Sequence, residues 1–331
     1  MGITGHANQY RSQPKTVPPV PPVSLLSQTD SAAQPPINCG QLWGGRCAVV
    51  VGPPRWTHTR EHPTVWVRRV RIKDQDFPPV VLGWLARDLD PEIRGGVAGH
   101  PNCPSAALSE LAADQELNVR WEVARHPSCP PAALARLAQD KHRSVRINVA
   151  RNLSNSPATR RQLARDQYDD VRRAVAERPD ITPTLLRHLA RDQAPRVLRA
   201  VAGNPSTPPA VLEQFASYSD GDVRREVAEH PRCPPRALQQ LTQDHSSWVR
   251  AAVATHPNCP PALLEQLAQD KHEAVRYVVA DNPRCPPGTL VQLLGDPNSS
   301  VSEAAGDNPA LPRATLAMWQ LAHDQQQPVV S

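Results

Sequence analysis

Apolar side chains recur at a fixed interval of 26 residues through most of this chain. Two further apolar columns keep the same interval, beginning at Ile93 and Val97 and ending at Val301 and Ala305. Periodicity of this length is typical of stacked supersecondary units, each of which buries its apolar face against its neighbours. It predicts nine full repeats over residues 78–311 and a partial tenth over 312–331. The first column contains Leu85, Leu111, Leu137, Leu163, Leu189, Phe215, Leu241, Leu267, Leu293 and Trp319.

Each repeat has the pattern of two short helices. In the eighth repeat Pro261 stands where a helix begins, because proline is tolerated at the first helical position. The three-residue step from Leu264 to Leu267 suits a 3₁₀-helix as well as an α-helix. The four-residue step from Val275 to Val279 predicts an α-helical face. Neither helix is long enough to be stable alone in water, so the pattern predicts an all-α solenoid with α/α or α/3₁₀ repeats.

The chain before the repeats has a different composition. Residues 1–52 contain the proline-rich stretches KTVPPVPPVS and AAQPPIN, which predict a disordered or poorly ordered tail. In residues 53–77, Val67 keeps the register of the repeats but Arg71 occupies the next apolar column, which indicates a degenerate N-terminal cap. Residues 78–331 are the predicted solenoid.

The net charge of +5 lies in the first 77 residues, which hold nine Lys or Arg and four Asp or Glu. Residues 78–331 hold 28 side chains of each sign, unlike a uniformly basic nucleic-acid-binding protein. Within the array, however, residues 130–207 hold 15 basic and seven acidic side chains. No apolar run reaches the roughly 20 residues that cross a bilayer, and the first residues lack the segments of a signal peptide. Because the seven Cys form no disulfide framework, we expect a cytoplasmic protein.

An Asp and an Arg recur together, six residues apart, in most repeats. One hypothesis makes the Arg column a track for anions. The other makes each Asp a helix cap that pairs with the Arg of its own or the next repeat. Because both columns recur in step, we favour the structural interpretation. The pairs are Asp88/Arg94, Asp114/Arg120, Asp140/Arg146, Asp166/Arg172, Asp244/Arg250 and Asp270/Arg276.

Four repeats contain the motif His-Pro-x-Cys, and both residue types are zinc ligands. Equivalent side chains of stacked helices lie about 8–10 Å apart, whereas the ligands of one zinc ion lie within about 2.3 Å of it. We therefore expect no metal site and interpret the Cys as small buried apolar residues. The chain also lacks GxxxxGK[ST], GxSxG and HExxH motifs, so we expect neither enzymatic activity nor a cofactor. The motifs are His100/Cys103, His126/Cys129, His230/Cys233 and His256/Cys259.

The whole repeat reads Leu-x-x-Leu-Ala-x-Asp, four residues, then Val-Arg-x-x-Val-Ala-x-Asn/His-Pro-x-Cys-Pro. This pattern resembles the leucine-rich repeat variant family over about three quarters of the chain. The resemblance implies a right-handed superhelix of alternating α- and 3₁₀-helices, similar to HEAT-like and armadillo-like solenoids. Some members carry an N-terminal iron–sulfur cluster held by four Cys. Only Cys39 and Cys47 precede the repeats here, so the chain departs from that pattern.

The central repeats depart most from the repeat pattern. Arg160 occupies a Leu position and Leu198 occupies an Arg position, while Asn152-Leu153 replaces the usual residue-Pro pair. Such departures are typical of functional or strained sites, although ordinary decay of a repeat explains them nearly as well.

The outer face of the second helix varies from repeat to repeat. The residue two positions after the first Val lies about 200° around the helix from it, so it points away from the core. In the central repeats this face carries basic residues with a Trp and an Ile, which is typical of a surface that a solenoid offers to a protein. The predicted partner-binding residues are Trp121, Arg125, Ile147, Arg151, Arg173, Arg196, Arg199 and Arg225.

We therefore expect a non-catalytic scaffold that binds a protein with an acidic segment through the outer face of its second helices. Two alternatives remain from the sequence. One is nucleic-acid binding by the same basic stripe, which would weaken steeply with salt. The other is an iron–sulfur-linked redox protein that uses Cys39 and Cys47. No membrane partner is expected.

Overall fold

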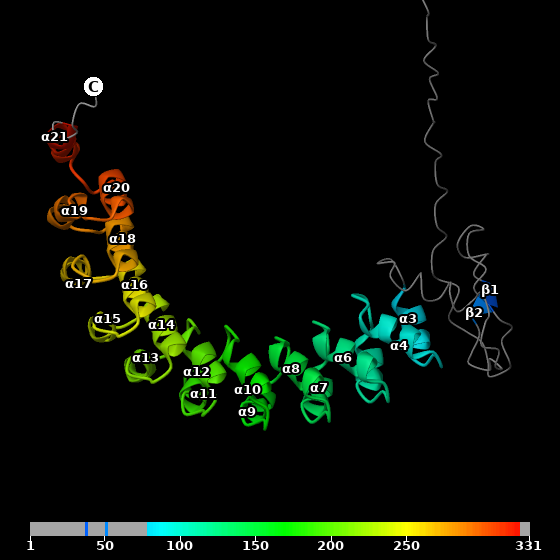
Figure 1. Ribbon diagram of the computed structural model, residues 1–331. Coiled ribbons are helices and arrows are strands. Elements are labelled where there is room, and N and C mark those ends of the chain that lie inside the picture. Colours follow the sequence, from blue (N-terminus) through cyan, green and yellow to red (C-terminus); the bar gives the residue numbers. More distant parts are fainter. Residues whose placement is uncertain (1–36, 39–49, 52–77, 325–331) are drawn as a thin grey trace, which may run out of the picture. The chain divides into compact units, whose positions relative to one another are not determined.

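The computed structural model describes residues 37–38, 50–51 and 78–324, with side chains described over 78–321. The chain divides into two units between His58 and Thr59. In the first unit, strand β1 (Ile37–Asn38) pairs antiparallel with strand β2 (Val50–Val51). The second unit contains helices α3 to α21 (Figure 1). The predictions for most of the tail, for the cap at 53–77 and for Cys39 and Cys47 concern residues outside these described ranges.

The helices of the second unit alternate between the two positions of each repeat, odd-numbered helices first and even-numbered helices second. The first helices are α3 (Pro79–Leu85), α5 (Ser105–Leu111), α7 (Pro131–Leu137), α9 (Pro157–Leu163), α11 (Pro183–Leu189), α13 (Pro209–Phe215), α15 (Pro235–Leu241), α17 (Pro261–Leu267), α19 (Pro287–Leu294) and α21 (Arg313–Asp324). The second helices are α4 (Pro91–Ala98), α6 (Leu117–Arg125), α8 (Arg143–Arg151), α10 (Asp169–Ala176), α12 (Pro195–Ala202), α14 (Gly221–Glu229), α16 (Ser247–Thr255), α18 (Glu273–Asp281) and α20 (Ser299–Asp307).

The two kinds of helix form two rows. Each second helix packs against the second helices of the neighbouring repeats in one continuous row, whereas neighbouring first helices touch much less (Figure 1). The apolar columns lie between the rows: every residue of the columns that begin at Ile93 and Val97 is at most 1% exposed. The first column is buried from Leu111 to Leu293, and its end member Trp319 is partly buried. The predicted all-α solenoid of 26-residue repeats is confirmed.

The first helices are α-helical, which decides between the two geometries that the Leu spacing allowed. Helix α17 is an α-helix of seven residues with Pro261 in its first turn. A 3₁₀-type turn follows it, because the N–H groups of Gln269 and Asp270 donate to carbonyls three residues earlier. Within residues 37–38, 50–51 and 78–324, no helix has the length and apolar character of a membrane span.

Candidate functional site

An Arg–Asp ladder joins consecutive repeats along the second helices. In its most buried pair, Arg224 Nε and Nη2 donate to the two carboxylate oxygens of Asp244 at 2.5 and 3.1 Å. These side chains are 5% and 4% exposed. Arg224 Nη1 also donates to the carbonyls of Tyr218 and Ser219. The pairs are Arg94–Asp114, Arg120–Asp140, Arg146–Asp166, Arg172–Asp192, Arg224–Asp244, Arg250–Asp270 and Arg276–Asp296.

The structural interpretation of these residues is confirmed, but two details of the predicted geometry are wrong. Each Asp pairs with the Arg of the preceding repeat, 20 residues earlier, and not with the Arg of its own or the next repeat. The Asp also does not occupy the N-cap: Asp244 accepts from the N–H of Ser246, and Ser246 is the N-cap of α16. The Arg reaches its own repeat only through backbone carbonyls, as Arg224 does at Tyr218.

Both members of the ladder pair are held in their charged forms. Burial alone would raise the pKa of Asp244, but the hydrogen bonds from Arg224 and from the backbone N–H of Ser246 lower it below its usual value. The hydrogen bond to Asp244 in turn raises the pKa of Arg224. The ladder therefore consists of fixed, mutually satisfied charges, and it offers no free cation to a passing anion.

One junction has an apolar pair in place of the charged one. Between the fifth and sixth repeats, Leu198 and Tyr218 occupy the Arg and Asp positions. Leu198 is 1% exposed, and the ring of Tyr218 lies 6.1 Å from that of Phe215. Because both partners change together, no buried charge is left without its counter-charge.

Buried His and Asn side chains connect the turns after the second helices. His230 Nε2 lies 2.9 Å from the carbonyl oxygen of Asn204 in the preceding repeat. His230 Nδ1 accepts from the N–H of Arg232, so the proton of the neutral ring is on Nε2 and donates to that carbonyl. At the equivalent position one repeat earlier, Asn204 Nδ2 donates to the carbonyls of Ala176 and Arg178. The column contains His100, His126, Asn152, Arg178, Asn204, His230, His256, Asn282 and Asn308.

This arrangement predicts that acid weakens the fold through His230. Burial lowers the pKa of His230, so the ring stays neutral in the folded chain while the unfolded chain takes up a proton near the ordinary His pKa of about 6.5. Stability is therefore complete above about pH 6.5 and falls as the pH drops from there toward the lowered pKa, by at most about 1.4 kcal/mol per pH unit for one His. We expect His230→Asn, which copies Asn204, to retain the fold and to reduce this dependence. Urea unfolding at pH 7.5 and 5.5 measures it, and equal pH effects in the two proteins would contradict the assignment.

The repeated Cys are buried and chemically protected. The five Cys of the repeats are 1–7% exposed and form no disulfides. Burial raises the pKa of the Cys103 and Cys129 thiols to about 12, so neither is a thiolate at neutral pH. Their predicted role as small apolar residues fits this environment. Over the part of the chain that the structure describes, no three His, Cys, Asp or Glu side chains gather as metal ligands.

A second charge cluster explains one irregular position. Arg160, at a position where other repeats bury Leu, donates to Asp180 Oδ2 at 2.5 Å. Asp180 also receives two hydrogen bonds from Arg178, whose side chain is 2% exposed. Arg178 Nη1 donates to the carbonyls of Ala150 and Asn152. The departures at these positions thus compensate one another inside the structure.

The predicted partner-binding Arg side chains all lie on second helices or at their ends, next to acidic side chains. Arg196 lies 3.2 Å from Asp169, and Arg199 lies 3.1 Å from Asp222. Arg173 and Arg225 lie 3.3 and 3.9 Å from a Glu one turn later on the chain. Ion pairs also join Arg125 to Glu122 and Arg151 to Glu177. The basic stripe of the sequence is therefore a mixed surface of Arg and carboxylate groups.

The apolar side chains of this face differ in exposure. Trp121 and Ile147 are partly buried against the core, and the guanidinium of Arg125 lies 5.1 Å from the centre of the Trp121 ring. Trp248 on α16 is 76% exposed and Tyr277 on α18 is 44% exposed. Helical periodicity places Trp248 on the outer face of the second helices. It does not predict how exposed the side chain is, because that depends on the residues packed around it. These two aromatics join the candidate site.

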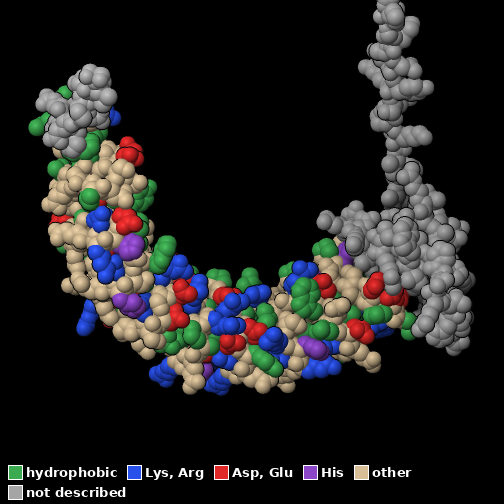
Figure 2. Space-filling view, viewed as in Figure 1, with side chains coloured by type: hydrophobic (Ala, Val, Ile, Leu, Met, Phe, Trp, Pro, Cys, Tyr) green, Lys and Arg blue, Asp and Glu red, His purple; other side chains and the backbone are tan. Residues whose placement is uncertain are grey.

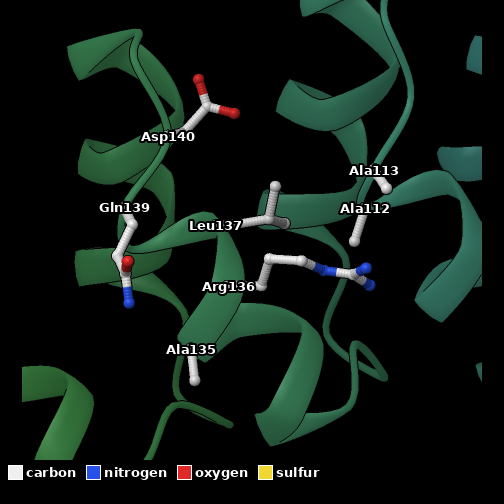
Figure 3. Close-up of a pocket in the computed structure, with 7 residues that line it drawn as sticks. All are labelled: Ala112, Ala113, Ala135, Arg136, Leu137, Gln139 and Asp140. Carbon is white, nitrogen blue, oxygen red and sulfur yellow. The ribbon is translucent and has the colours of Figure 1, made fainter.

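A shallow depression between α5 and α7 has no catalytic character. Figure 3 shows Arg136 reaching across it toward Ala112, with the methyl groups of Ala113 and Ala135 on its walls. Arg136 donates to the carbonyl of Ser109 on α5. The carboxylate at its edge, Asp140, already pairs with Arg120 in the ladder. No nucleophile and base meet there.

The repeat geometry agrees with comparisons to known proteins. The sequence profile of the leucine-rich repeat variant matches residues 91–116, 117–142, 221–246 and 248–272. These segments of the array are leucine-rich repeat variant repeats. The profile of the leucine-rich repeat variant domain also matches residues 170–230 of this solenoid. No curated relative matches the sequence.

Solved structures resemble the leucine-rich repeat variant array to different degrees. A leucine-rich repeat variant described as having a novel repetitive structural motif is 29% identical, with a TM-score of 0.50 over 61% of this chain and 80% of that one. The YibA protein of Escherichia coli is 18% identical, with a TM-score of 0.35 over 75% of this chain and 97% of that one. A designed armadillo repeat protein is 14% identical, with a TM-score of 0.22 over 73% of this chain and 100% of that one.

Proposed function

We propose that this solenoid is a non-catalytic scaffold that binds a protein partner along the outer face of its second helices. A repeat-solenoid fold is consistent with a protein-binding role, because it presents side chains from many repeats on one extended surface. The observation that carries the proposal is the exposure of Trp248. A Trp that is 76% exposed on a well-packed helix is an apolar anchor without a partner, and Trp is enriched among the residues that dominate binding energy.

The Arg residues of this face support an acidic segment in the partner. Arg173 and Arg225 lie near Glu side chains, and their Nε atoms are buried and form no hydrogen bond. Both side chains remain at least a third exposed. Carboxylates of a partner would add charge-assisted hydrogen bonds at the exposed parts of these two side chains. The same face continues toward the first repeats, where the other predicted partner-binding residues lie: Trp121, Arg125, Ile147, Arg151, Arg196 and Arg199.

The proposal predicts that Trp248→Ala/Tyr277→Ala weakens partner binding by about 30-fold or more, because truncating a dominant interface residue costs about 2 kcal/mol or more. Partners would be isolated from nuclease-treated lysate of the source cells, identified, and titrated against each variant. A charge-reversal variant, Arg173→Glu/Arg199→Glu/Arg225→Glu, tests the acidic segment. The matched control is Trp84→Ala, which removes an exposed Trp from the first helix α3.

Retention of the same proteins with the same affinity by wild type and by both second-helix variants would refute this site. Loss of binding in the Trp84→Ala control as well would point to the first-helix row instead. The alternative of nucleic-acid binding by the second-helix stripe is less favoured, since the acidic neighbours of these Arg residues leave little net positive charge, and the exposed Trp248 and Tyr277 suit the apolar centre of a protein interface. An iron–sulfur centre at Cys39 and Cys47 remains a prediction about residues outside the described ranges.

A further inference from the structure

The basic excess of residues 130–207 lies on the side of the first helices. Of the 15 basic side chains there, five have acidic neighbours on the second-helix face and two belong to the Arg–Asp ladder. Arg160 and Arg178 share Asp180. The remaining six are exposed and form no ion pair within residues 78–321. We call them the first-helix basic patch: Arg136, Lys141, Arg161, Arg165, Arg187 and Arg191.

Four of these residues repeat from one helix to the next. Arg161 lies in the last turn of α9 and Arg165 follows four residues later, just beyond the C-cap. Arg187 and Arg191 occupy the same positions on α11. The two helices therefore present two rows of guanidinium groups to solvent. Lys and Arg side chains along the edge of the first helices are visible in Figure 2.

The three helices of the patch carry no acidic side chain of their own, and the carboxylates at its borders are Glu110 on α5, Asp180 before α11 and Glu213 on α13. Helices α7, α9 and α11 have the sequences PAALARL, PATRRQL and PTLLRHL, and none contains an Asp or Glu. The carboxylates of Asp140, Asp166 and Asp192 in the following turns are turned into the ladder, where Arg groups neutralise them. A helix C-terminus favours a nearby cation, which accounts for one Arg at the end of each helix. It does not account for the lack of Asp and Glu on these three helices.

The composition of the patch selects the class of partner. None of the large apolar side chains exposed in the described chain lies on α7, α9 or α11, and the nearest in sequence, Leu153 and Tyr168, lie in the turns before and after α9, so the helices themselves lack the apolar centre of a protein interface. The lack of aromatics on these helices also removes the platform on which single-stranded bases stack. Duplex nucleic acid carries about one negative charge per 1.7 Å of helix axis. Its phosphates can therefore neutralise such a patch at any position along the duplex.

We propose that the first-helix basic patch binds the phosphate backbone of a nucleic-acid duplex without reading its sequence. This surface is separate from the second-helix face and does not depend on the protein partner proposed there. With six cations in contact, log K falls against log salt with a slope of about −5, which is roughly a thousandfold loss between 50 and 200 mM salt.

The test measures binding of the full chain to a fluorescein-labelled 30-base-pair DNA duplex from 50 to 200 mM NaCl. In Arg161→Gln/Arg165→Gln/Arg187→Gln/Arg191→Gln we expect affinity at 50 mM to fall by about 100-fold or more and the salt slope to flatten by about 3–4. The matched control is Arg173→Gln/Arg196→Gln/Arg199→Gln/Arg225→Gln, which removes the same charge from the second-helix face. We expect its affinity to fall by less than about fivefold, because those Arg groups already face carboxylates.

The basic segment before the repeats is common to all three proteins, so differences among them report on the arrays. Circular dichroism shows whether each variant is folded, and the substituted side chains of the patch variant are exposed and without ion pairs. Absence of binding by the wild type at 50 mM, or equal losses in the two variants, would overturn the proposal. Displacement of the duplex by poly-L-glutamate at equal charge concentration would also overturn it, in favour of an acidic protein. Binding of the protein partner by the patch variant is expected to be unchanged, which keeps the two proposals distinguishable.

Discussion

Replacing Arg224 by Leu is expected to lower the free energy of unfolding by about 3–5 kcal/mol, the usual effect of removing one partner from a buried ion pair. Asp244 would be left as a carboxylate that is 4% exposed and has lost its counter-charge. The carbonyls of Tyr218 and Ser219 would lose their donor at the same time. Urea unfolding followed by circular dichroism at 222 nm measures the loss. Because each repeat contacts only its neighbours, the transition is expected to broaden or split at this junction.

The chain contains the control for this experiment. Arg224→Leu/Asp244→Tyr copies the apolar pair at Leu198 and Tyr218, so it removes the buried charge together with its partner. We expect the double variant to recover most of the stability, since replacing both members of a buried pair by apolar groups is often nearly neutral. Arg224→Lys keeps the charge but lacks the planar fork, and it should lie between the two. A double variant as unstable as Arg224→Leu would show that charge pairing is not what the ladder contributes.

The direction of the ladder illustrates what the sequence leaves undetermined. The Asp and Arg columns predicted a structural role, but Asp114 is six residues from Arg120 and 20 from Arg94. In a 26-residue repeat, Asp114 is flanked by one Arg of the column on each side. Only the packing of the helices in the structure decides that Arg94 is its partner. Burial of the apolar columns could be predicted without knowing which repeats touch, because each column occupies one face of its helix. Tyr218 was overlooked, although its departure 20 residues after Leu198 was the visible signal of the pairing.

The surface was harder to predict than the core for the same reason. Residues 130–207 have an excess of positive charge whose side chains lie on both rows of helices. The sequence-based interpretation placed this excess on the second helices alone. The acids that face Arg196 and Arg199 come from neighbouring repeats, Asp169 and Asp222, so they are not apparent from either helix alone. Exposure of the aromatics likewise depended on neighbours: Arg125 covers Trp121, whereas Trp248 stands free.

Asp180→Ala is expected to destabilise the chain by about 2–4 kcal/mol, less than the ladder variant because Asp180 is 43% exposed. Burial alone would raise the pKa of Asp180, but the hydrogen bond from Arg178 and the charges of Arg178 and Arg160 lower it, so the carboxylate is ionised. Its removal leaves Arg178, 2% exposed, and Arg160, 16% exposed, as two neighbouring cations with no counter-charge between them. Urea unfolding again gives the free energy.

The Arg160→Leu background shows whether these three residues compensate one another. Leu restores the apolar residue that other repeats bury at this position, such as Leu134 and Leu186, and it leaves the Arg178–Asp180 pair intact. We expect Arg160→Leu alone to be neutral or stabilising, and Asp180→Ala to cost less in that background, because only one cation is then left unpaired. The difference between the two costs is the coupling of Arg160 to Asp180. Equal costs in both backgrounds would mean that Arg160 tolerates burial without Asp180, and that its place in the core follows from the local shape of the repeat alone.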